Sequence, residues 1–411
     1  GGTAFTGEAR WLEIALDCGD GETTLSPRQE LTPSPYALHA STSDSVPWNG
    51  LVNVPPGFAD GTDDDTQLSE AEVEAYVIDE PLNLAEGTTL GDETISTLVS
   101  GGCDAIQSAI DGLPPSGGQI VVKAGTYTCT QSIVIDRDNV DLRGQGSATI
   151  LRLGDGVNLP LLVVGQTSTP PTLVRTNVHV SDLTLDGNRD NQDYECYEDD
   201  CEANPIRNNG ITLRGVSDVL IERVTVIGAR SGGLVAEKGC QRVAVHDFTA
   251  VDNHFDGLAA YETENSRFSG LHLLNNCAAG LSFDIDFNNN IIDNVLTVRD
   301  ADSRCQPGLP DGAVGIFMRD SRDNLFESIQ IRNTREHGIF LAQEVGVPGS
   351  AATGNTFTGV VVSGAGGAGL RANDATVLNT LVAGSQFIGN AEGCISEVVE
   401  GQVETFGVIC R

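Results

Sequence analysis

The segment Gly232-Gly233-Leu234-Val235-Ala236 decides the fold of this 411-residue chain, because its pattern of a glycine followed by alternating apolar residues recurs. Intervals of 23 to 35 residues separate the copies, and the two longest contain insertions around residues 303–312 and 344–353. The repeat glycines are Gly210, Gly233, Gly257, Gly280, Gly315, Gly338 and Gly369. A period in this range predicts a solenoid, in which each coil buries its apolar face against its neighbours.

Strand alternation assigns the residues that follow each glycine to two faces. The first and third positions are apolar in every copy, so we expect them to point inward and form the core. The first position holds Ile211, Leu234, Leu258, Leu281, Ile316, Ile339 and Leu370, and the third holds Leu213, Ala236, Ala260, Phe283, Met318, Leu341 and Ala372. The glycines themselves suit a tight corner with positive φ or a close approach between coils.

The second and fourth positions after each glycine are expected to face solvent. The second holds Thr212, Val235, Ala259, Ser282, Phe317, Phe340 and Arg371, and the fourth holds Arg214, Glu237, Tyr261, Asp284, Arg319, Ala342 and Asn373. Aromatic rings beside charged groups suit sugars, which have apolar faces and polar rims. We therefore predict that Phe317, Phe340, Arg214 and Arg371 bind substrate. The alternative is that an inserted loop or a partner chain covers these rings.

The chain is strongly acidic, with 58 Asp and Glu residues against 23 Lys and Arg and a formal net charge of −35. This charge disfavours nucleic acid and anionic membranes as partners, because both require a basic patch. It is typical of a soluble extracellular protein, or of one that holds divalent cations between carboxylates. The sequence has no run of about 20 apolar residues, so we expect no membrane span. It opens inside an expected strand, and we expect its precursor to begin earlier.

Ten cysteines, with no Cys-x-x-Cys pair of the metal-binding kind, favour disulfides and an oxidising compartment. The candidate pairs are Cys103 with Cys129, Cys196 with Cys201, and Cys394 with Cys410. The remaining cysteines, Cys18, Cys240, Cys277 and Cys305, cannot be paired from the sequence. Free buried cysteines in a cytosolic protein are the alternative.

The chain divides into three predicted regions. Residues 1–40 contain a short strand and a proline-rich extended leader, and residues 41–93 form an acidic, stalk-like linker with too few apolar residues for a core. Residues 94–411 contain the solenoid. Apolar residues at helical spacing predict a helix over residues 94–113, and this helix would cap the open backbone edge of the first coil.

Two segments resemble known families. The block AIQSAIDGLPPSGGQIVVKAGTY at residues 105–127 resembles the N-terminal cap of the pectate-lyase-like right-handed parallel β-helix superfamily. Residues 180–191, VSDLTLDGNRDN, resemble a segment of the catalytic modules of alginate (mannuronan) C5-epimerases. The resemblance covers roughly residues 100–390. It implies an all-β fold, a right-handed parallel β-helix with an N-terminal capping helix, preceded by the extended leader.

The resemblance to the epimerases also implies where their chemistry would lie. Those enzymes remove the C5 proton of a uronate with an Asp-Pro-His-Glu motif, an upstream tyrosine, a later aspartate and an Arg-His pair. Aligned on the repeat glycines, these positions fall on Val235-Ala236-Glu237-Lys238, Gly232, Tyr261 and Ala278-Ala279. None of them holds the epimerase residue, so we predict that the catalytic residues of that family have been lost.

A different polar set occupies the same predicted face. Glu237, Tyr261, Asp284 and Arg319 follow four consecutive repeat glycines, about 4.8 Å apart per coil, and His337 precedes a later one. In a lyase-like site, Tyr261 or His337 would be the base, Arg319 would hold the uronate, and Glu237 or Asp284 would be the acid or a cation ligand. The alternative is a ladder of charges that only stabilises the coils.

Calcium is the candidate cofactor. Asp284 and Asp286 would bind it, because alternation along a strand would point both carboxylates to one face.

The stretches TTLSPRQELTPSPYALHA at residues 23–40 and WNGLVNVPPGFADGTDDD at residues 48–65 resemble the segments that precede stalk regions in large bacterial surface and tail-fibre-like proteins, and the resemblance covers about the first 80 residues. This implies a secreted, multidomain parent. Our hypothesis is a secreted β-helix module of a bacterial surface fibre, filament or adhesin, which binds polysaccharide or neighbouring subunits. Residues 1–90 would mediate self-assembly into a trimer or filament. The alternative is an acidic-polysaccharide enzyme, a uronate lyase or C5-epimerase with a rearranged site.

Overall fold

A computed structural model describes residues 9–17, 19, 21–31, 96–193, 206–299, 305 and 314–411. The chain divides into two compact units, Gly1–Leu90 and Gly91–Arg411. Cys18, Cys196, Cys201 and the whole linker predicted over residues 41–93 lie outside the described residues. Within the described residues, no helix has the length and apolar character needed to cross a membrane.

The first unit contains two antiparallel strand pairs, β1 (Arg10–Leu12) with β4 (Gln29–Leu31) and β2 (Ala15–Asp17) with β3 (Glu22–Thr24). The one short strand expected within residues 1–40 is thus replaced by four short strands. Large apolar side chains of this unit are exposed, and Trp11 has 54% of its surface accessible. The leader therefore presents apolar surface that its described residues do not bury.

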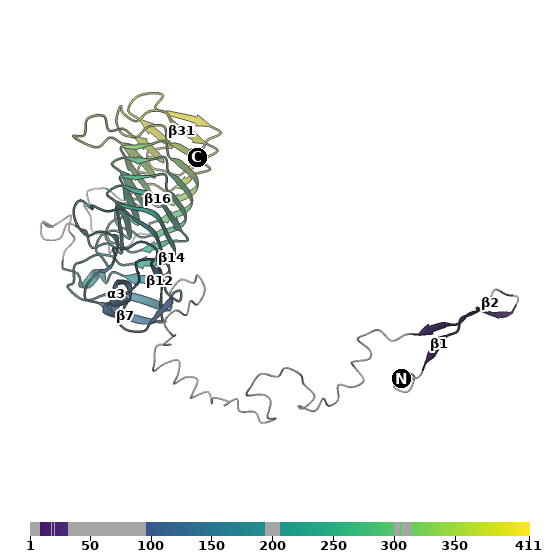
Figure 1. Cartoon of the computed structure of the whole chain (residues 1–411). Helices are drawn as coiled ribbons and strands as arrows, with labels where there is room; N and C mark the ends of the chain where they lie inside the picture. Colours follow the sequence, from purple (N-terminus) through teal and green to yellow (C-terminus); the bar gives the residue numbers. More distant parts are fainter. Residues whose placement is uncertain are drawn as a thin grey trace. The chain divides into compact units, whose positions relative to one another are not determined.

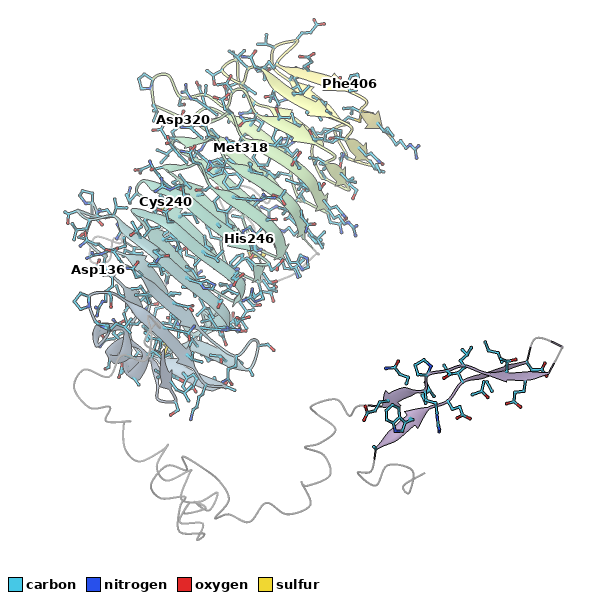
Figure 2. All side chains as sticks on the ribbon, turned by 45° about the vertical axis from the view of Figure 1, so that its right-hand side comes forward. Asp136, Cys240, His246, Met318, Asp320 and Phe406 are labelled. Carbon is cyan, nitrogen blue, oxygen red and sulfur yellow. A yellow bond between two sulfur atoms is a disulfide. The ribbon has the colours of Figure 1, made fainter. Side chains whose placement is uncertain are left out.

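The second unit is a right-handed parallel β-helix, as the sequence predicts, with its strands stacked from β7 at one end to β31 near the other (Figure 1). Figure 2 marks the progression of coils from Asp136 through Cys240 to Phe406. A ten-stranded sheet, here called the repeat sheet, follows the repeat glycines. Its strands are β8 (Ile133–Ile135), β11 (Leu162–Gly165), β13 (Ile211–Arg214), β15 (Leu234–Glu237), β18 (Leu258–Tyr261), β21 (Leu281–Asp284), β24 (Ile316–Arg319), β27 (Ile339–Ala342), β30 (Leu370–Ala372) and β33 (Ile395–Glu397).

The remaining strands of this unit form one bent 21-stranded sheet that completes each coil. They are β5 (Ser96–Val99), β6 (Gly118–Val122), β7 (Gly125–Cys129), β9 (Val140–Arg143), β10 (Thr149–Leu153), β12 (Arg175–Asp186), β14 (Val216–Ile227), β16 (Cys240–His246), β17 (Thr249–Val251), β19 (Thr263–Glu264), β20 (Arg267–Leu274), β22 (Phe287–Asn288), β23 (Ile291–Val298), β25 (Ser321–Arg322), β26 (Leu325–Arg332), β28 (Thr356–Thr358), β29 (Val361–Ser363), β31 (Thr380–Ala383), β32 (Gln386–Ile388), β34 (Val403–Phe406) and β35 (Ile409–Cys410). A short 3-10 helix, η2 (Arg189–Asn191), follows β12.

The core forms as the repeat predicts. Every residue at the first and third positions after a repeat glycine is fully buried, and the strands pair in the register that aligns these positions from coil to coil. Phenylalanine rings stack inside the solenoid, for example Phe283 on Phe287 with ring centres 4.1 Å apart. Burial of these apolar columns stabilises the coils.

The repeat glycines are required by close packing. None of them has a positive φ, so the tight-corner explanation is wrong. A Cβ atom at Gly338 would lie 2.2 Å from Cγ1 of Val362 and 2.6 Å from the carbonyl oxygen of Gly369 on the next coil. Only a residue without a side chain fits between these atoms.

The coils turn at positions where the backbone adopts the left-handed conformation, and these positions align from coil to coil. Asp182, Arg223, Asp247, Gly270 and Asn294 occupy equivalent places on five successive coils and all have positive φ. A second column is a buried asparagine ladder, in which Asn290 Nδ2 donates to Asn324 Oδ1 at 3.1 Å and Asn324 Nδ2 donates to Asn355 Oδ1 at 3.0 Å. The amides supply the hydrogen bonds that buried polar groups at a corner need.

The predicted cap is half helix and half strand. Residues 96–99 form β5, which pairs in parallel with β6, and the helix is shorter, α3 (Cys103–Asp111). Gly101 and Gly102 lie between the strand and the helix. Glycine destabilises the interior of both kinds of element, so the chain changes from one to the other there. Ile106 and Ile110 are buried and pack α3 onto the first coil. Figure 1 shows α3 at the same end of the solenoid as β7. Arg137 donates to carbonyl oxygens at the helix end, including Ile110 at 2.9 Å.

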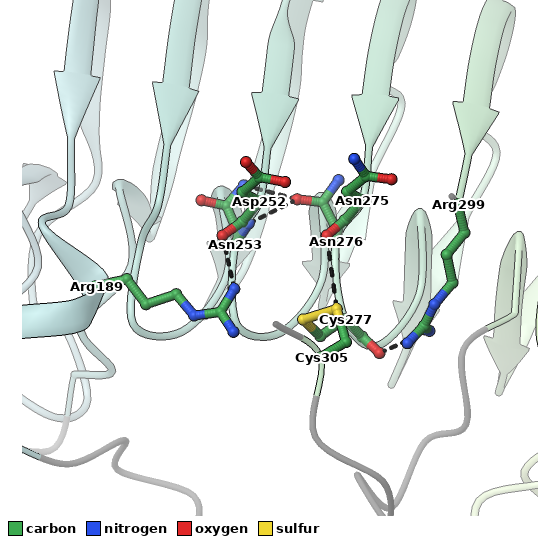
Figure 3. The surroundings of a disulfide bond; sticks show 8 residues. All are labelled: Arg189, Asp252, Asn253, Asn275, Asn276, Cys277, Arg299 and Cys305. Carbon is green, nitrogen blue, oxygen red and sulfur yellow. Dashed lines mark hydrogen bonds between the residues drawn. A yellow bond between two sulfur atoms is a disulfide. The ribbon is translucent and has the colours of Figure 1, made fainter. Parts of the chain in front are cut away.

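Three disulfides are present among the described cysteines. Two are pairs that the sequence suggested: Cys103–Cys129, which ties α3 to β7, and Cys394–Cys410 in the last coils. The third, Cys277–Cys305, could not be assigned from the sequence (Figure 3). Cys240 is free and fully buried, and burial raises the pKa of its thiol to about 11, so it stays protonated at neutral pH.

An ion-pair network joins the first coils on their outer surface. His179 on β12 lies between Asp141 and Glu222, with Nδ1 3.2 Å from Asp141 Oδ1 and Nε2 3.0 Å from Glu222 Oε1. Arg223 extends the network to Asp182, with Nε 2.7 Å from Oδ1. The hydrogen bond to Asp141 raises the pKa of His179 above its ordinary value, and burial opposes it.

We expect the contribution of His179 to stability to depend on pH. Because its folded pKa is raised, the contribution is complete below the unfolded pKa of about 6.5 and is lost as the pH rises through the folded value. The pKa of Asp141 is lowered by its hydrogen bond to His179, and that of Glu222 by its hydrogen bond to Arg223. Their contribution is present above about pH 4.5 and is lost as the pH falls through the lowered values.

His179→Gln should therefore lower the melting temperature by about one to three degrees near pH 5.5 and have little effect near pH 8.5. Calorimetric melts of both proteins at the two pH values measure this difference. An equal loss at both values would show that the histidine charge makes no contribution.

Candidate functional site

The outer face of the repeat sheet is largely covered, so the prediction that its second and fourth positions face solvent is wrong. Thr212 and Arg214 are fully buried, and Asp284 is only 3% exposed. Segments between the coils lie over this face. The residues after β11 contact Arg214, whose Nη1 donates to the carbonyl oxygen of Thr167 at 2.9 Å. Residues of the 344–353 insertion contact Arg319.

A pocket of about 300 Å³ remains on this face, over β15, β18, β21 and β24. The sequence predicted four polar residues that line it: Glu237, Tyr261, Asp284 and Arg319. Phe317 also contributes to the wall. The other lining residues are Arg207, Asn209, Ser231, Gly232, Val235, Lys238, Phe255, Asp256, Glu262, Ser282 and Ile285. The four residues that the repeat places in one column therefore line a single pocket.

Arg214 supports the pocket from below. Its Nε lies 2.8 Å from Glu237 Oε1, and its two terminal nitrogens donate to Thr167 and to Thr169 Oγ1. The side chain has no exposed surface, so Arg214 holds Glu237 in place and does not reach a ligand. Burial raises the pKa of Glu237, and the charge of Arg214 opposes this.

Asp284 and Arg319 form the charged wall on the other side. Arg319 Nη2 donates to Asp284 Oδ2 at 2.5 Å, and its Nε lies 2.9 Å from Glu344 Oε2. Burial raises the pKa of Asp284 to about 7, against the opposing charge of Arg319. A carboxyl group in this range can hold or release a proton near neutral pH.

Three residues that line the pocket carry hydroxyl groups: Ser231, Tyr261 and Ser282. Burial raises the pKa of Tyr261, so its phenol is protonated at neutral pH and hydrogen-bonds with Ser282. It is therefore a hydrogen-bonding group in this state and not a ready base. Ser231 is 1% exposed, and its Oγ has no hydrogen-bond partner in the described structure. A buried hydroxyl without a partner costs free energy unless a ligand or water satisfies it.

The aromatic residues predicted to bind substrate, Phe317 and Phe340, stack on each other. The Phe317 and Phe340 rings lie parallel with centres 5.6 Å apart, and the Arg319 guanidinium lies 5.0 Å from the Phe317 ring centre. The imidazole of His337 stacks on Phe340 at 5.8 Å. Phe340 thus packs against two other rings of this face. Phe317 reaches the pocket, whereas Phe340 does not line it.

His337 and Arg371 lie outside the pocket. The His337 Nδ1 accepts a hydrogen bond from the amide of Ala368 at 2.9 Å, and burial lowers the pKa of the ring. Arg371 pairs in register with Phe340 and donates to Ser396 Oγ. The structure therefore does not bring His337 to the pocket residues predicted to act with it, and it places Arg371 beside Phe340 but not at the pocket.

The two candidate calcium ligands diverge. Ile285 and Asp286 both have positive φ, so the strand alternation ends at Asp284. Asp284 is buried and paired with Arg319, whereas Asp286 is exposed. Across the described parts of the chain, no three His, Cys, Asp or Glu side chains are grouped in a way that could hold a metal ion.

The alternation after each repeat glycine did not point to the residues just before the glycines. Ser231 lies two residues before Gly233 and Asp256 one residue before Gly257, and both line the pocket. The same register that aligned the strands could have identified them. Phe255 packs with the Cys277–Cys305 disulfide and Ala278, so this disulfide supports the pocket wall.

No family model matches the chain. Its sequence is similar to mannuronan C5-epimerase AlgE1 of Azotobacter vinelandii, with 28% identity over 195 residues. The match covers 43% of this chain and 13% of that protein, so this chain spans only a small part of its curated relative.

Solved structures share the fold. ORF18 of Geobacillus virus E2 superposes with a TM-score of 0.61 and 17% identity over 77% of this chain and 59% of that chain. Pectate lyase Pel9A superposes with a TM-score of 0.53 and 12% identity over 76% of this chain and 79% of that chain. The resemblance to right-handed parallel β-helix proteins, including epimerases and pectate lyases, is thereby confirmed at the level of the fold.

Proposed function

We propose that this chain is a secreted β-helix module of a bacterial surface fibre, filament or adhesin, and that its pocket binds polysaccharide. The observation that carries the proposal is the convergence of Tyr261, Ser231, Asp284 and Arg319 on one pocket, whose lining also includes the apolar residues Val235 and Phe317. Sugars present hydroxyl groups that donate and accept, and such a pocket has partners for both. The disulfides and the acidic surface support an oxidising, extracellular compartment.

Ser231→Ala tests the pocket directly. Ser231 Oγ makes no hydrogen bond in the described structure, so the variant should fold with unchanged stability. If a sugar hydroxyl pairs with Ser231, the loss of one hydrogen bond should weaken binding about three- to tenfold. Calorimetric titration with a panel of oligosaccharides measures the dissociation constant.

Ser385→Ala is the matched control. Ser385 is also fully buried, but its Oγ accepts from the amide of Val360 and donates to the carbonyl of Ala383. This variant should lose stability and keep its affinity for sugar. Unchanged binding by Ser231→Ala would contradict a ligand at this pocket.

The second candidate is an enzyme that acts on acidic polysaccharide, a uronate lyase or C5-epimerase. The raised pKa of Asp284 favours it, because a group near neutral pKa can act as acid or base. The absence of the epimerase residues at positions 235–238 and 278–279 counts against it. Two assays test this candidate: the release of unsaturated product from uronate polymers, and the exchange of the C5 proton in deuterated water. An activity of the native protein that Tyr261→Phe loses would establish the enzyme.

We also propose that the leader mediates self-assembly of copies of this chain. An isolated two-stranded hairpin is marginally stable in water, and here Trp11, Leu12, Leu16 and Leu25 remain exposed. Packing of several leaders together would bury these side chains. In the full chain, Trp11→Ser with Leu16→Ser should shift the molar mass measured by light scattering toward the monomer. Thr23→Ser is the control, and an equal mass in all three proteins would contradict the proposal.

A further inference from the structure

Lys238 and Arg319, two of the three basic side chains that line the pocket, already have acidic partners. Lys238 Nζ lies 3.3 Å from Glu262 Oε1 at the rim. Arg319 contacts both Asp284 and Glu344, and Arg214 beneath the floor contacts Glu237. The remaining lining cation, Arg207, lies over the Phe255 ring at 5.1 Å. The site is therefore built from paired charges.

Acidic side chains outnumber basic ones in the lining. The acidic ones are Glu237, Asp256, Glu262 and Asp284, and the basic ones are Arg207, Lys238 and Arg319. A carboxylate on a ligand would have to displace one of these acidic partners and then lie near the others. Like charges held close together in a partly buried site repel strongly. The net charge of −35 adds a repulsion that acts on a polyanion before contact.

An uncharged hydroxyl group meets none of these obstacles. The Asp256 and Asp284 carboxylates can accept from it, while Arg319 can donate to it without losing its partner. Tyr261 can donate or accept, and the unsatisfied Ser231 Oγ can do both. Val235 and the exposed Ile285 offer apolar surface to the C–H groups of a sugar ring.

We infer that the pocket selects an uncharged sugar chain and discriminates against uronate polymers. This inference rests on the proposed polysaccharide binding and names the class of ligand. It separates this site from the chemistry of a uronate-processing enzyme, in which a free cation must neutralise the carboxylate of the substrate.

A matched pair of ligands tests the inference. Oligogalacturonate and oligomannuronate can be converted to neutral oligosaccharides of the same linkage by reducing each carboxyl group to a hydroxymethyl group. The full chain is titrated with each acid and its reduced form in low salt, once with EDTA and once with calcium. We expect the reduced form of at least one pair to bind tenfold or more tightly than the acid. The difference should shrink as salt is added.

One variant should change the preference. Glu262→Gln releases Lys238 at a partly exposed position, so the fold should be retained and the acid form should gain affinity about threefold or more. Glu327→Gln removes an exposed negative charge on β26, away from the pocket, and should leave the preference unchanged.

The outcomes are distinguishable. Equal or tighter binding of the acid form in either buffer overturns the inference but keeps the proposed polysaccharide binding. An unchanged preference in Glu262→Gln likewise overturns the assignment of discrimination to paired charges. If neither the acids, nor their reduced forms, nor a panel of neutral gluco-, manno- and xylo-oligosaccharides binds, the proposed function fails and the inference fails with it.

Discussion

Arg214→Met is expected to lower the free energy of unfolding by about 3–5 kcal/mol, because it breaks a largely buried ion pair and leaves Glu237 without its counter-charge. Arg214 is fully buried, and its guanidinium also serves Thr167 and Thr169. Methionine fills similar volume but supplies none of these hydrogen bonds. Urea titration followed by circular dichroism measures the loss.

The double variant Arg214→Met with Glu237→Leu separates charge from packing. Replacing both partners by apolar groups of similar size removes the unpaired carboxylate, so most of the lost stability should return. The pocket would still lack one of its polar walls, so sugar binding should remain weak. If Arg214→Met alone is as stable as the native protein, Arg214 does not support the site.

Gly338→Ser is expected to cost about 3 kcal/mol, the upper end of the usual cost of overpacking. Its Cβ would lie 2.2 Å from Val362 and 2.6 Å from a backbone oxygen, and neither atom can move without displacing a coil. The control is Gly102→Ser, the same substitution at the N-cap of α3, where no heavy atom lies within 4 Å. Serine is a favoured N-cap, so the control should keep or slightly raise stability.

Thermal unfolding of the two variants by calorimetry compares them directly. Equal melting temperatures would contradict the account of the repeat glycines as close-packing residues. A lower melting temperature in Gly338→Ser, with no loss in Gly102→Ser, supports the close-packing account. The same account then applies to Gly315, whose Cβ would lie 2.4 Å from Ile331.

Parts of the candidate site could be predicted, and parts could not. Glu237, Tyr261, Asp284 and Arg319 were placed together correctly, because strand register in a repeat is a local property. Their environment was not predicted: Arg214 and Asp284 were expected in solvent and are buried. The calcium prediction for Asp284 and Asp286 assumed that the strand continues, whereas the chain turns at Ile285.

The sequence by itself determined the solenoid of this protein, the inward columns and the helical part of the cap. Each of these follows from apolar residues that recur at a fixed period, and a period needs no knowledge of distant contacts. Only the tertiary structure decided which outer residues face a pocket, which cysteine pairs with Cys277, and which cations are already paired. These depend on segments far apart in the chain that fold over the repeat sheet, and no local pattern records where such segments come to lie.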